Sequence, residues 1–352
     1  MTVLLNCHTE LVKALRVNAW GGAPEAVTVA DLEPGEGEVL VRVAACGVGM
    51  TVLNCIRGDL GNDPSNLPLV PGHELVGSIT KTGPGVDPRR EGELVTAYFY
   101  LSCGRCDMCL AGTEDLCLDF GGYLGVNRDG GYAEYAVLPD RNAIPLPEGS
   151  DPVLSTTVPD AVATPVHVAR RANVTPGKRV AVIGAGGGVG IHMVQVARAY
   201  GADVVGLDVV TAKLDYLTRE LNVRAVDFSR PEGVDRRQMG FGADPDVIVD
   251  FIGSAATQRW AIEHLGVGGR LVALTTFPAV DYRLSPREIV LGELSILGSR
   301  YATRYELRLA AQLVRSGAVQ AVVGRREGPE RLAEIHDDLV QGRLLGRGAL
   351  VW

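Results

Sequence analysis

The chain has 352 residues and a formal net charge of −8; 46% of its residues are hydrophobic and 22% are charged. This composition is typical of a globular protein with room for two domains and a large core. The acidic balance excludes a basic nucleic-acid-binding surface. We expect a cytoplasmic protein without a membrane segment. Residues 1–10 lack a basic start followed by a long apolar run, and the uncharged stretch 180–197 contains five glycines.

The predicted elements change in character along the chain. Residues 13–146 are rich in turns and strand-like segments, and a half-buried strand is predicted at 38–45. Further strands are predicted at 179–184, 203–208, 246–250 and 269–274, and helices at 191–200 and 305–316. Alternating strands and helices predict a doubly wound parallel sheet of the Rossmann type. We therefore expect a Rossmann domain at 158–291, inserted into a β-rich domain made of residues 1–157 and 292–352.

Four closely spaced cysteines stand in the loop 103–117. They are Cys103, Cys106, Cys109 and Cys117, separated by two, two and seven residues. Four thiolates complete the tetrahedral coordination of zinc and leave no position for a substrate, so this spacing predicts a structural zinc site. Disulfides are disfavoured in a chain without a secretory signal, and the Cys-Pro ending of the common iron–sulfur motif is absent. The other cysteines, Cys7, Cys46 and Cys55, are expected to be free thiols.

A glycine-rich loop follows the strand predicted at 179–184. It consists of Gly184, Ala185, Gly186, Gly187, Gly188, Val189 and Gly190. Such a loop lets the backbone approach a pyrophosphate, and the helix behind it favours the negative charge. The strict Gly-x-Gly-x-x-Gly spacing is not met, and a purely structural turn is the alternative.

An acidic residue ends the next predicted strand. Asp208 lies 18 residues after Gly190, where a carboxylate binds the hydroxyls of the adenosine ribose and repels a 2′-phosphate. This position favours NAD(H) over NADP(H), and Lys213 is placed to reach the same ribose. The alternative for Asp208 is a solvated strand end.

These features together resemble the zinc-containing medium-chain alcohol dehydrogenase family, from Lys13 to the end of the chain. The most specific segments are Val-Pro-Gly-His-Glu at 70–74, the four-cysteine loop, the glycine-rich loop with Asp208, and the ending at 346–351. The resemblance implies an α/β protein with a GroES-like catalytic domain, a Rossmann domain and an active site between them. It also implies a small-molecule substrate and a homodimer or homotetramer.

The resemblance assigns roles to individual residues, with one departure. The family binds a catalytic zinc through Cys, His and a third Cys or Asp. His73 and Asp160 match the last two positions, but Gly49 stands at the first. Either zinc binds through His73, Asp160 and Glu74, or the site is metal-free. Thr51 would relay a proton, and Arg347 would contact the cofactor. The alternatives are a loop histidine, a helix N-cap for Asp160 and a turn threonine.

The implied function is NAD(H)-dependent hydride transfer between an alcohol and an aldehyde or ketone. Without a catalytic zinc, hydride addition to an activated C=C bond is favoured instead, because the charge spreads into an enolate that hydrogen bonds can stabilise. An NAD(P)H-dependent enoyl reductase is thus the first alternative, and a non-catalytic dinucleotide-binding sensor is the second. Residues expected near the cleft or in the core are Met50, Leu53, Tyr98, Tyr100 and Tyr123.

Overall fold

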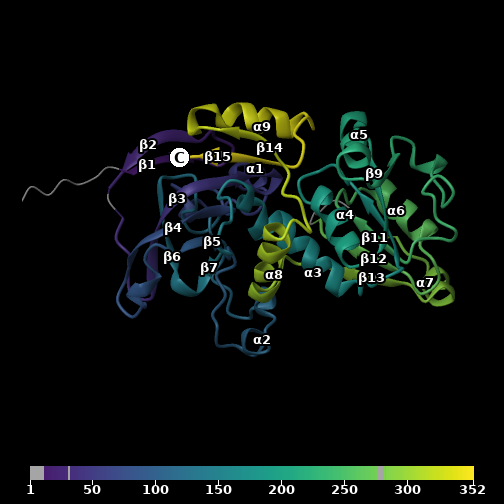
Figure 1. Cartoon of the computed structure of the whole chain (residues 1–352), viewed down its shortest axis with the longest axis horizontal. Coiled ribbons are helices and arrows are strands. Elements are labelled where there is room, and N and C mark those ends of the chain that lie inside the picture. The colour runs from purple at the N-terminus through teal and green to yellow at the C-terminus, as the bar shows by residue number, and fades with distance from the viewer. Residues whose placement is uncertain (1–11, 31, 276–280, 282) are drawn as a thin grey trace, which may run out of the picture.

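The computed structural model describes residues 12–30, 32–275, 281 and 283–352 (Figure 1). Cys7 and most of the N-terminal segment lie outside these residues. Figure 1 shows two sheet-containing halves arranged along the long axis, with helices α3 (Ala163–Arg171) and α8 (Arg304–Arg315) between them. No helix in the described part of the chain is long and apolar enough to cross a membrane.

The first half is built around a seven-stranded sheet with the path β14-β15-β3-β4-β5-β7, in which β6 also pairs with β3. Its strands are β3 (Glu38–Val48), β4 (Leu75–Thr82), β5 (Leu94–Ala97), β6 (Tyr135–Pro139), β7 (Ala143–Pro145), β14 (Val323–Glu327) and β15 (Arg347–Val351). A separate hairpin pairs β1 (Val12–Arg16) with β2 (Glu25–Val29). The strand predicted at 38–45 lies within β3, whose Val39, Val41 and Val43 are buried in the core.

The C-terminal strand closes this sheet and brings distant residues together. β15 pairs antiparallel with β3, with Gly348 opposite Val48. This register places Arg347 beside the start of helix α1 (Met50–Arg57), which directly follows β3. Residues almost 300 positions apart in sequence thereby become neighbours.

The second half is a six-stranded parallel sheet in the order β10-β9-β8-β11-β12-β13. Its strands are β8 (Arg179–Ile183), β9 (Asp203–Asp208), β10 (Arg224–Asp227), β11 (Val247–Asp250), β12 (Arg270–Ala273) and β13 (Ser295–Gly298). This is the doubly wound order of a dinucleotide-binding fold, and its short apolar strands suit burial on both faces. The accompanying helices are α4 (Gly190–Ala199), α5 (Thr211–Arg219), α6 (Ala255–His264) and α7 (Pro286–Gly292). β13 belongs to this sheet although it follows Leu291, where the sequence placed the end of the Rossmann domain.

One continuous core joins the two halves. Val41 of the first sheet, Val162 before α3 and Val182 of the second sheet belong to the same cluster of buried apolar residues. Because the halves share this core, the segment between them, which includes a π-helical turn at Val158–Val162, is held firmly. That turn carries Asp160.

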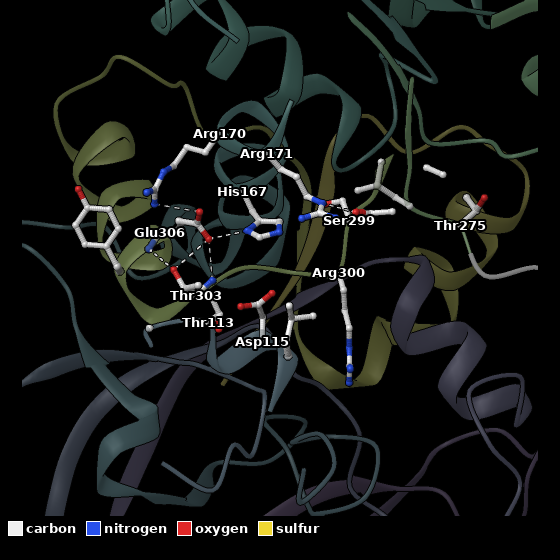
Figure 2. Close-up of a pocket in the computed structure, with 16 residues that line it drawn as sticks. Thr113, Asp115, His167, Arg170, Arg171, Thr275, Ser299, Arg300, Thr303 and Glu306 are labelled. Atoms are coloured by element: carbon white, nitrogen blue, oxygen red, sulfur yellow. Dashed lines mark hydrogen bonds and ion pairs between the residues drawn. The ribbon is translucent and has the colours of Figure 1, made fainter. Parts of the chain in front are cut away.

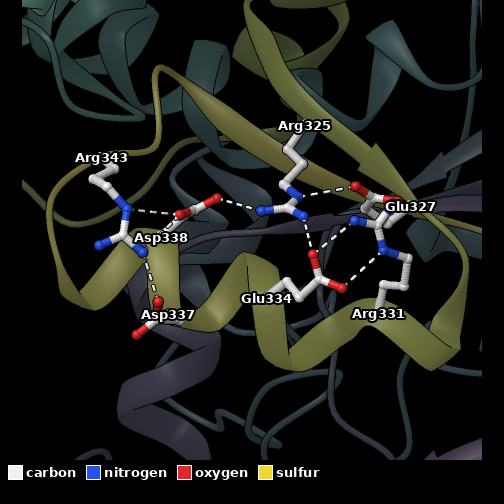
Figure 3. Close-up of polar contacts among 7 residues, drawn as sticks. All are labelled: Arg325, Glu327, Arg331, Glu334, Asp337, Asp338 and Arg343. Carbon is white, nitrogen blue, oxygen red and sulfur yellow. Dashed lines mark hydrogen bonds and ion pairs between the residues drawn. The ribbon is translucent and has the colours of Figure 1, made fainter.

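The C-terminal helix α9 (Leu332–Val340) is fastened to β14 by a network of ion pairs (Figure 3). Arg325 of β14 contacts Glu334 and Asp338 of α9, and Arg331 bridges Glu327 and Glu334. These side chains are partly solvent-exposed, so each pair contributes little, although a network contributes more than isolated pairs. Its effect is to hold the strand next to β15 in place.

Candidate active site and zinc lobe

The four predicted cysteines converge at the tip of a lobe. Helix α2 (Asp107–Leu110) and the 3-10 turn Glu114–Leu116 lie between them. The Sγ atoms of Cys103 and Cys109 are 3.9 Å apart, and so are those of Cys106 and Cys117. A tetrahedron with zinc–sulfur bonds of about 2.3 Å separates its sulfurs by roughly 3.8 Å. Disulfide-bonded sulfurs would be about 2.05 Å apart. The arrangement therefore fits a zinc ion.

Backbone amides donate hydrogen bonds to three of the same four sulfurs, those of Cys103, Cys106 and Cys117. Arg105 donates its N–H to the sulfur of Cys103, and Leu118 donates to that of Cys106, each at 3.4 Å. The backbone hydrogen bonds, first that from Leu118, lower the pKa of Cys106 to about 6. Thiolate rather than thiol binds zinc, so these contacts favour the liganding form. The lobe is fastened to the rest of the chain by Glu114, which accepts from the backbone and side chain of Arg304.

The glycine-rich loop lies between β8 and α4, at the sheet's switch point. A side chain at Gly190 would place its Cβ only 2.1 Å from the carbonyl oxygen of Gly184, so the loop can close this tightly only with glycine there. No hydrogen bond to the backbone amides of Gly188 or Val189 is found within the described residues. Two free amides at the start of a helix fit the pyrophosphate of a dinucleotide.

The second cofactor signal is joined directly to this loop. Asp208, at the end of β9, accepts a hydrogen bond at 2.8 Å from the amide of Gly186, and its other oxygen accepts from Val209 and Val210. Lys213 of α5 packs over Gly186. Burial lowers the pKa of Lys213, partly offset by the charge of Asp208. The structure thus brings the glycine loop, Asp208 and Lys213 together, and Asp208 is not merely a solvated strand end.

A buried histidine that sequence reasoning missed ties the loop to the C-terminal segment. His192 of α4 has Nδ1 2.8 Å from the carbonyl oxygen of Gly188, and its Nε2 accepts from the amide of Val322 at 3.1 Å. The carbonyl of Val322 accepts in turn from the amide of Arg347. Burial lowers the pKa of His192 to about 4, which keeps the ring neutral with its proton on Nδ1. In the sequence, the only indication of this role was the position of His192 in the first turn of the helix that follows the glycine-rich loop.

Three of the four predicted catalytic residues, all except Thr51, form one buried cluster. His73 and Glu74 lie just before β4, and Asp160 lies on the π-helical turn. His73 Nε2 is 3.6 Å from Asp160 Oδ2, and a ligand atom from each of the three residues lies within 4.8 Å of the others. Asp160 Oδ1 accepts from Thr164 at 2.7 Å. Asp160 is therefore no helix N-cap; it is directed into the cluster.

Arg347 supplies the positive charge of this cluster. Its Nε donates to Glu74 Oε1 at 3.1 Å, and its Nη2 donates to Asp160 Oδ2 at 2.8 Å. Burial lowers the pKa of Arg347, but the two carboxylates outweigh it and the net shift is upward. For Asp160, burial raises the pKa, but His73 and Arg347 bring it well below its usual range. Burial raises the pKa of Glu74 despite Arg347. Sequence reasoning assigned Arg347 to the cofactor alone.

Gly49 and Arg347 together decide how a catalytic zinc would fit. A Cβ atom at position 49 would lie 2.3 Å from Arg347 Nη1, so the guanidinium occupies the space of the missing first ligand. The same guanidinium binds the carboxylate oxygens of Glu74 and Asp160 that would have to face the metal. A three-ligand zinc site is not compatible with Arg347 in this position, because a dication would replace its hydrogen bonds and lie against a cation.

Aromatic rings line the other side of the cluster. The ring of Phe99 lies 4.6 Å from that of His73 and 4.1 Å from that of Tyr301. Tyr301 has a left-handed backbone conformation (φ 55°) and donates its hydroxyl to the carbonyl of Pro159 at 2.5 Å, which supports the turn that carries Asp160. Sequence reasoning missed Tyr301 because this contact spans 142 residues. Thr51 is half-buried in the first turn of α1.

The residues that sequence reasoning placed near the cleft or in the core divide between buried and exposed positions. Tyr98, Tyr100 and Leu53 are buried, whereas Met50 is 41% exposed. Tyr123 packs edge-on against Tyr100. The buried members of this group serve the core.

A separate cavity of about 660 Å³ contains none of the predicted site residues (Figure 2). It lies between the zinc lobe, α3, α8 and the segments after β12 and β13. His167 and Arg170 line it, and Figure 2 shows both directed at Glu306, which they contact at 2.8 and 3.1 Å. Two of its basic side chains are thus already paired with a carboxylate.

The fold and the site define a two-domain oxidoreductase that uses a dinucleotide. The alcohol dehydrogenase GroES-like domain model matches residues 35–148, and the zinc-binding dehydrogenase model matches residues 188–316. An alcohol dehydrogenase from Geobacillus stearothermophilus is 33% identical over 350 residues, covering 96% of this chain and 98% of that protein. The chain therefore belongs to the zinc-type medium-chain alcohol dehydrogenase family.

Two further relatives illustrate the range of the family. An acryloyl-coenzyme A reductase from Metallosphaera sedula is 30% identical over 325 residues, covering 92% of this chain and 94% of that protein. The structure of a thermostable alcohol dehydrogenase from Pyrobaculum aerophilum with cobalt and zinc bound superposes with a TM-score of 0.87 at 28% identity, covering 97% of this chain and 100% of the other. The predicted fold class, family and enzyme class are confirmed.

Proposed function

We propose that this oxidoreductase interconverts an alcohol and an aldehyde or ketone by hydride transfer to or from NAD(H). The observation that carries the proposal is the position of Arg347. Its guanidinium binds Glu74 and Asp160, and its Nη1 also approaches Gly188 of the glycine-rich loop, since a Cβ there would lie 2.6 Å from it. A dinucleotide on the loop and a substrate beside His73 would thereby be adjacent, as hydride transfer requires.

The proposed cofactor site uses residues that are already in contact. The free amides of Gly188 and Val189 and the N-terminus of α4 would bind the pyrophosphate. Asp208, with Lys213 beside it, would bind the adenosine ribose and select NAD(H) over NADP(H). NAD(H), when bound, supplies or accepts the hydride. The four cysteines would hold a structural zinc that stiffens the lobe and leaves no ligand position for a substrate.

The proposed substrate site has groups that can manage a proton. Within the described residues, His73 Nε2 and Glu74 Oε2 are buried without a hydrogen-bond partner. Unpaired buried polar atoms are costly, so a substrate oxygen that hydrogen-bonds to His73 would relieve one of them. Thr51, in the first turn of α1, would pass a proton between the substrate hydroxyl and the cofactor ribose.

A second candidate, reduction of an activated C=C bond, is favoured by one specific observation. Gly49 removes the first zinc ligand and Arg347 fills its place. Reduction of an enoyl thioester or enone depends less on a Lewis acid, because an N–H donor can stabilise the enolate. A relative at 30% identity carries the name acryloyl-coenzyme A reductase.

The test is steady-state turnover with a substrate panel. Purified protein is assayed with alcohols and NAD, with aldehydes and ketones and NADH, and with enones and enoyl thioesters and NADH, each repeated with the phosphorylated cofactor. Turnover of an alcohol–carbonyl pair with NAD(H) is the expected result. Turnover only of conjugated alkenes would support the second candidate. Tight NADH binding without turnover on any substrate would overturn both and leave the non-catalytic sensor.

Two expectations accompany this proposal. Homodimer or homotetramer formation rests on resemblance and is tested by light scattering during size-exclusion chromatography. A cytoplasmic location agrees with the free thiols of Cys46 and Cys55, because reducing compartments keep cysteines unpaired. Localisation of a tagged chain tests it.

A further inference from the structure

The guanidinium of Arg347 is held by two carboxylates on one edge. Nε and Nη2 face Glu74 Oε1 and Asp160 Oδ2 at 3.1 and 2.8 Å. The side chains of Arg347 and Glu74 are 5% and 0% exposed, so solvent does not screen this pair. The single positive charge of Arg347 therefore compensates part of the negative charge of the two buried carboxylates.

Gly49 is what lets the guanidinium lie there. The backbone of Gly49 is extended, with φ −139° and ψ 178°, a conformation that any residue adopts. The backbone conformation therefore does not require glycine. The lack of space requires it, because a Cβ would lie 2.3 Å from Nη1 and 2.8 Å from Cζ of Arg347. The missing side chain at position 49 and the position of Arg347 are two parts of one arrangement.

We propose that the Arg347 guanidinium takes the place of the catalytic metal, so that the active centre of this chain is metal-free. The inference rests on the proposed function, in that it names the cation of the same site. Of the three candidate ligands, Glu74 binds Arg347 through Oε1 and Asp160 binds it through Oδ2. The third, His73, has no hydrogen-bond partner for Nε2 among the described residues, which leaves this atom for a substrate. Nη1, beside Gly49 and Gly188, is the part of the guanidinium not engaged by the carboxylates.

The arrangement has a chemical consequence. A guanidinium offers fixed N–H donors and a permanent charge, but it has no vacant coordination position and cannot generate a metal-bound alkoxide. Negative charge that develops on a substrate oxygen is then met by hydrogen bonds alone. Among the aldehydes and ketones of the proposed function, the centre is best suited to those in which that charge is delocalised, as in conjugated carbonyl compounds.

The first test counts metal. Zinc per chain is measured by elemental analysis on wild type and on His73→Asn, after dialysis against a weak chelator. The expected result is one zinc in both proteins, bound by the four cysteines, which also serves as an internal measure of folded chain. Two zincs in wild type falling to one in His73→Asn would overturn the proposal.

The second test restores a metal site. In Gly49→Cys/Arg347→Leu the blocking cation is removed and the absent ligand is supplied, and the matched control Gly49→Ser/Arg347→Leu lacks only the thiolate. With zinc at the four cysteines, added Co²⁺ should give a thiolate-to-cobalt charge-transfer band in the cysteine variant and none in the control or wild type. A folded cysteine variant that takes up no second metal, or a wild type that takes one up, would overturn the proposal.

These metal counts are independent of turnover. A wild-type chain with one zinc and no activity on any substrate would contradict the proposed function while leaving the metal-free centre intact. A chain with two zincs and alcohol turnover would support the proposed function and contradict the metal-free centre.

Discussion

Gly49→Ala is the smallest change that probes the centre of the site. The extended backbone at this position accepts alanine, so the added methyl group acts only through its contact with Arg347 and through the helix cap. At 2.3 Å from Nη1, the methyl carbon forces the guanidinium to retreat by roughly 1 Å to reach an ordinary separation. The guanidinium is a rigid plane, so this retreat breaks or stretches its bonds to Glu74 and Asp160.

The expected cost follows from those bonds. A hydrogen bond to a charged group contributes about 1.5–3 kcal/mol, and loss of one of the two is the expected result. Gly49 is also the N-cap of α1, where alanine in place of glycine costs about 0.5–1 kcal/mol. Gly49→Ala should therefore destabilise the chain by about 2–4 kcal/mol.

A double-mutant cycle separates the two contributions. Urea unfolding, followed by circular dichroism, is measured for wild type, Gly49→Ala, Arg347→Met and the double variant. In the Arg347→Met background, which lacks Nη1, only the capping cost should remain. A coupling energy of at least about 1.5 kcal/mol is expected. Coupling below about 0.5 kcal/mol, within the additivity of independent sites, would refute the placement of Arg347 against residue 49.

Three further results are expected. Burial lowers the pKa of His192, and that of His336 in helix α9, from 6.5 to about 4. The unfolded chain therefore binds more protons than the folded chain between these values, and stability should fall as pH falls from about 6.5 to 4. His192→Gln or His336→Gln should each remove about one proton from the slope of unfolding free energy against pH. A slope unchanged in both variants would contradict the neutral buried rings. Asp208→Ser should lower the ratio of kcat/KM with NAD to kcat/KM with NADP at least about tenfold, because both the acceptor for the ribose hydroxyls and the repulsion of a 2′-phosphate disappear. An unchanged ratio in steady-state kinetics would show that Asp208 only supports the loop. The Cys106→Ser variant should lose the zinc, and its lobe should become sensitive to limited proteolysis. The control variant Cys55→Ser, which changes a buried thiol outside the lobe, should retain one zinc per chain by elemental analysis. Zinc retained in Cys106→Ser would contradict the four-cysteine assignment.

Local patterns in the sequence were sufficient to predict the glycine-rich loop with Asp208 and the four-cysteine site, because each depends on residues that are close together in the chain. The strand predicted at 179–184, the glycine-rich loop and Asp208 lie within one βαβ unit, so their arrangement follows from spacing alone. The four cysteines are likewise confined to 15 consecutive residues, and a short loop can bring them around one ion without help from the rest of the fold. The departure at Gly49 was also visible in the sequence.

The tertiary structure determined which side chain occupies the space beside Gly49. Pairing of β15 with β3 brings Arg347 against position 49, and the shared core brings Asp160 to the same place from a third segment. No periodicity or spacing encodes contacts between residues 74, 160 and 347, because strand register and domain packing arise from the whole buried surface. The sequence alone thus left zinc and a metal-free centre as equal alternatives for the catalytic cluster. Only the folded chain shows a guanidinium bound to both carboxylates, since burial makes such charges pair with whichever partner the fold brings near.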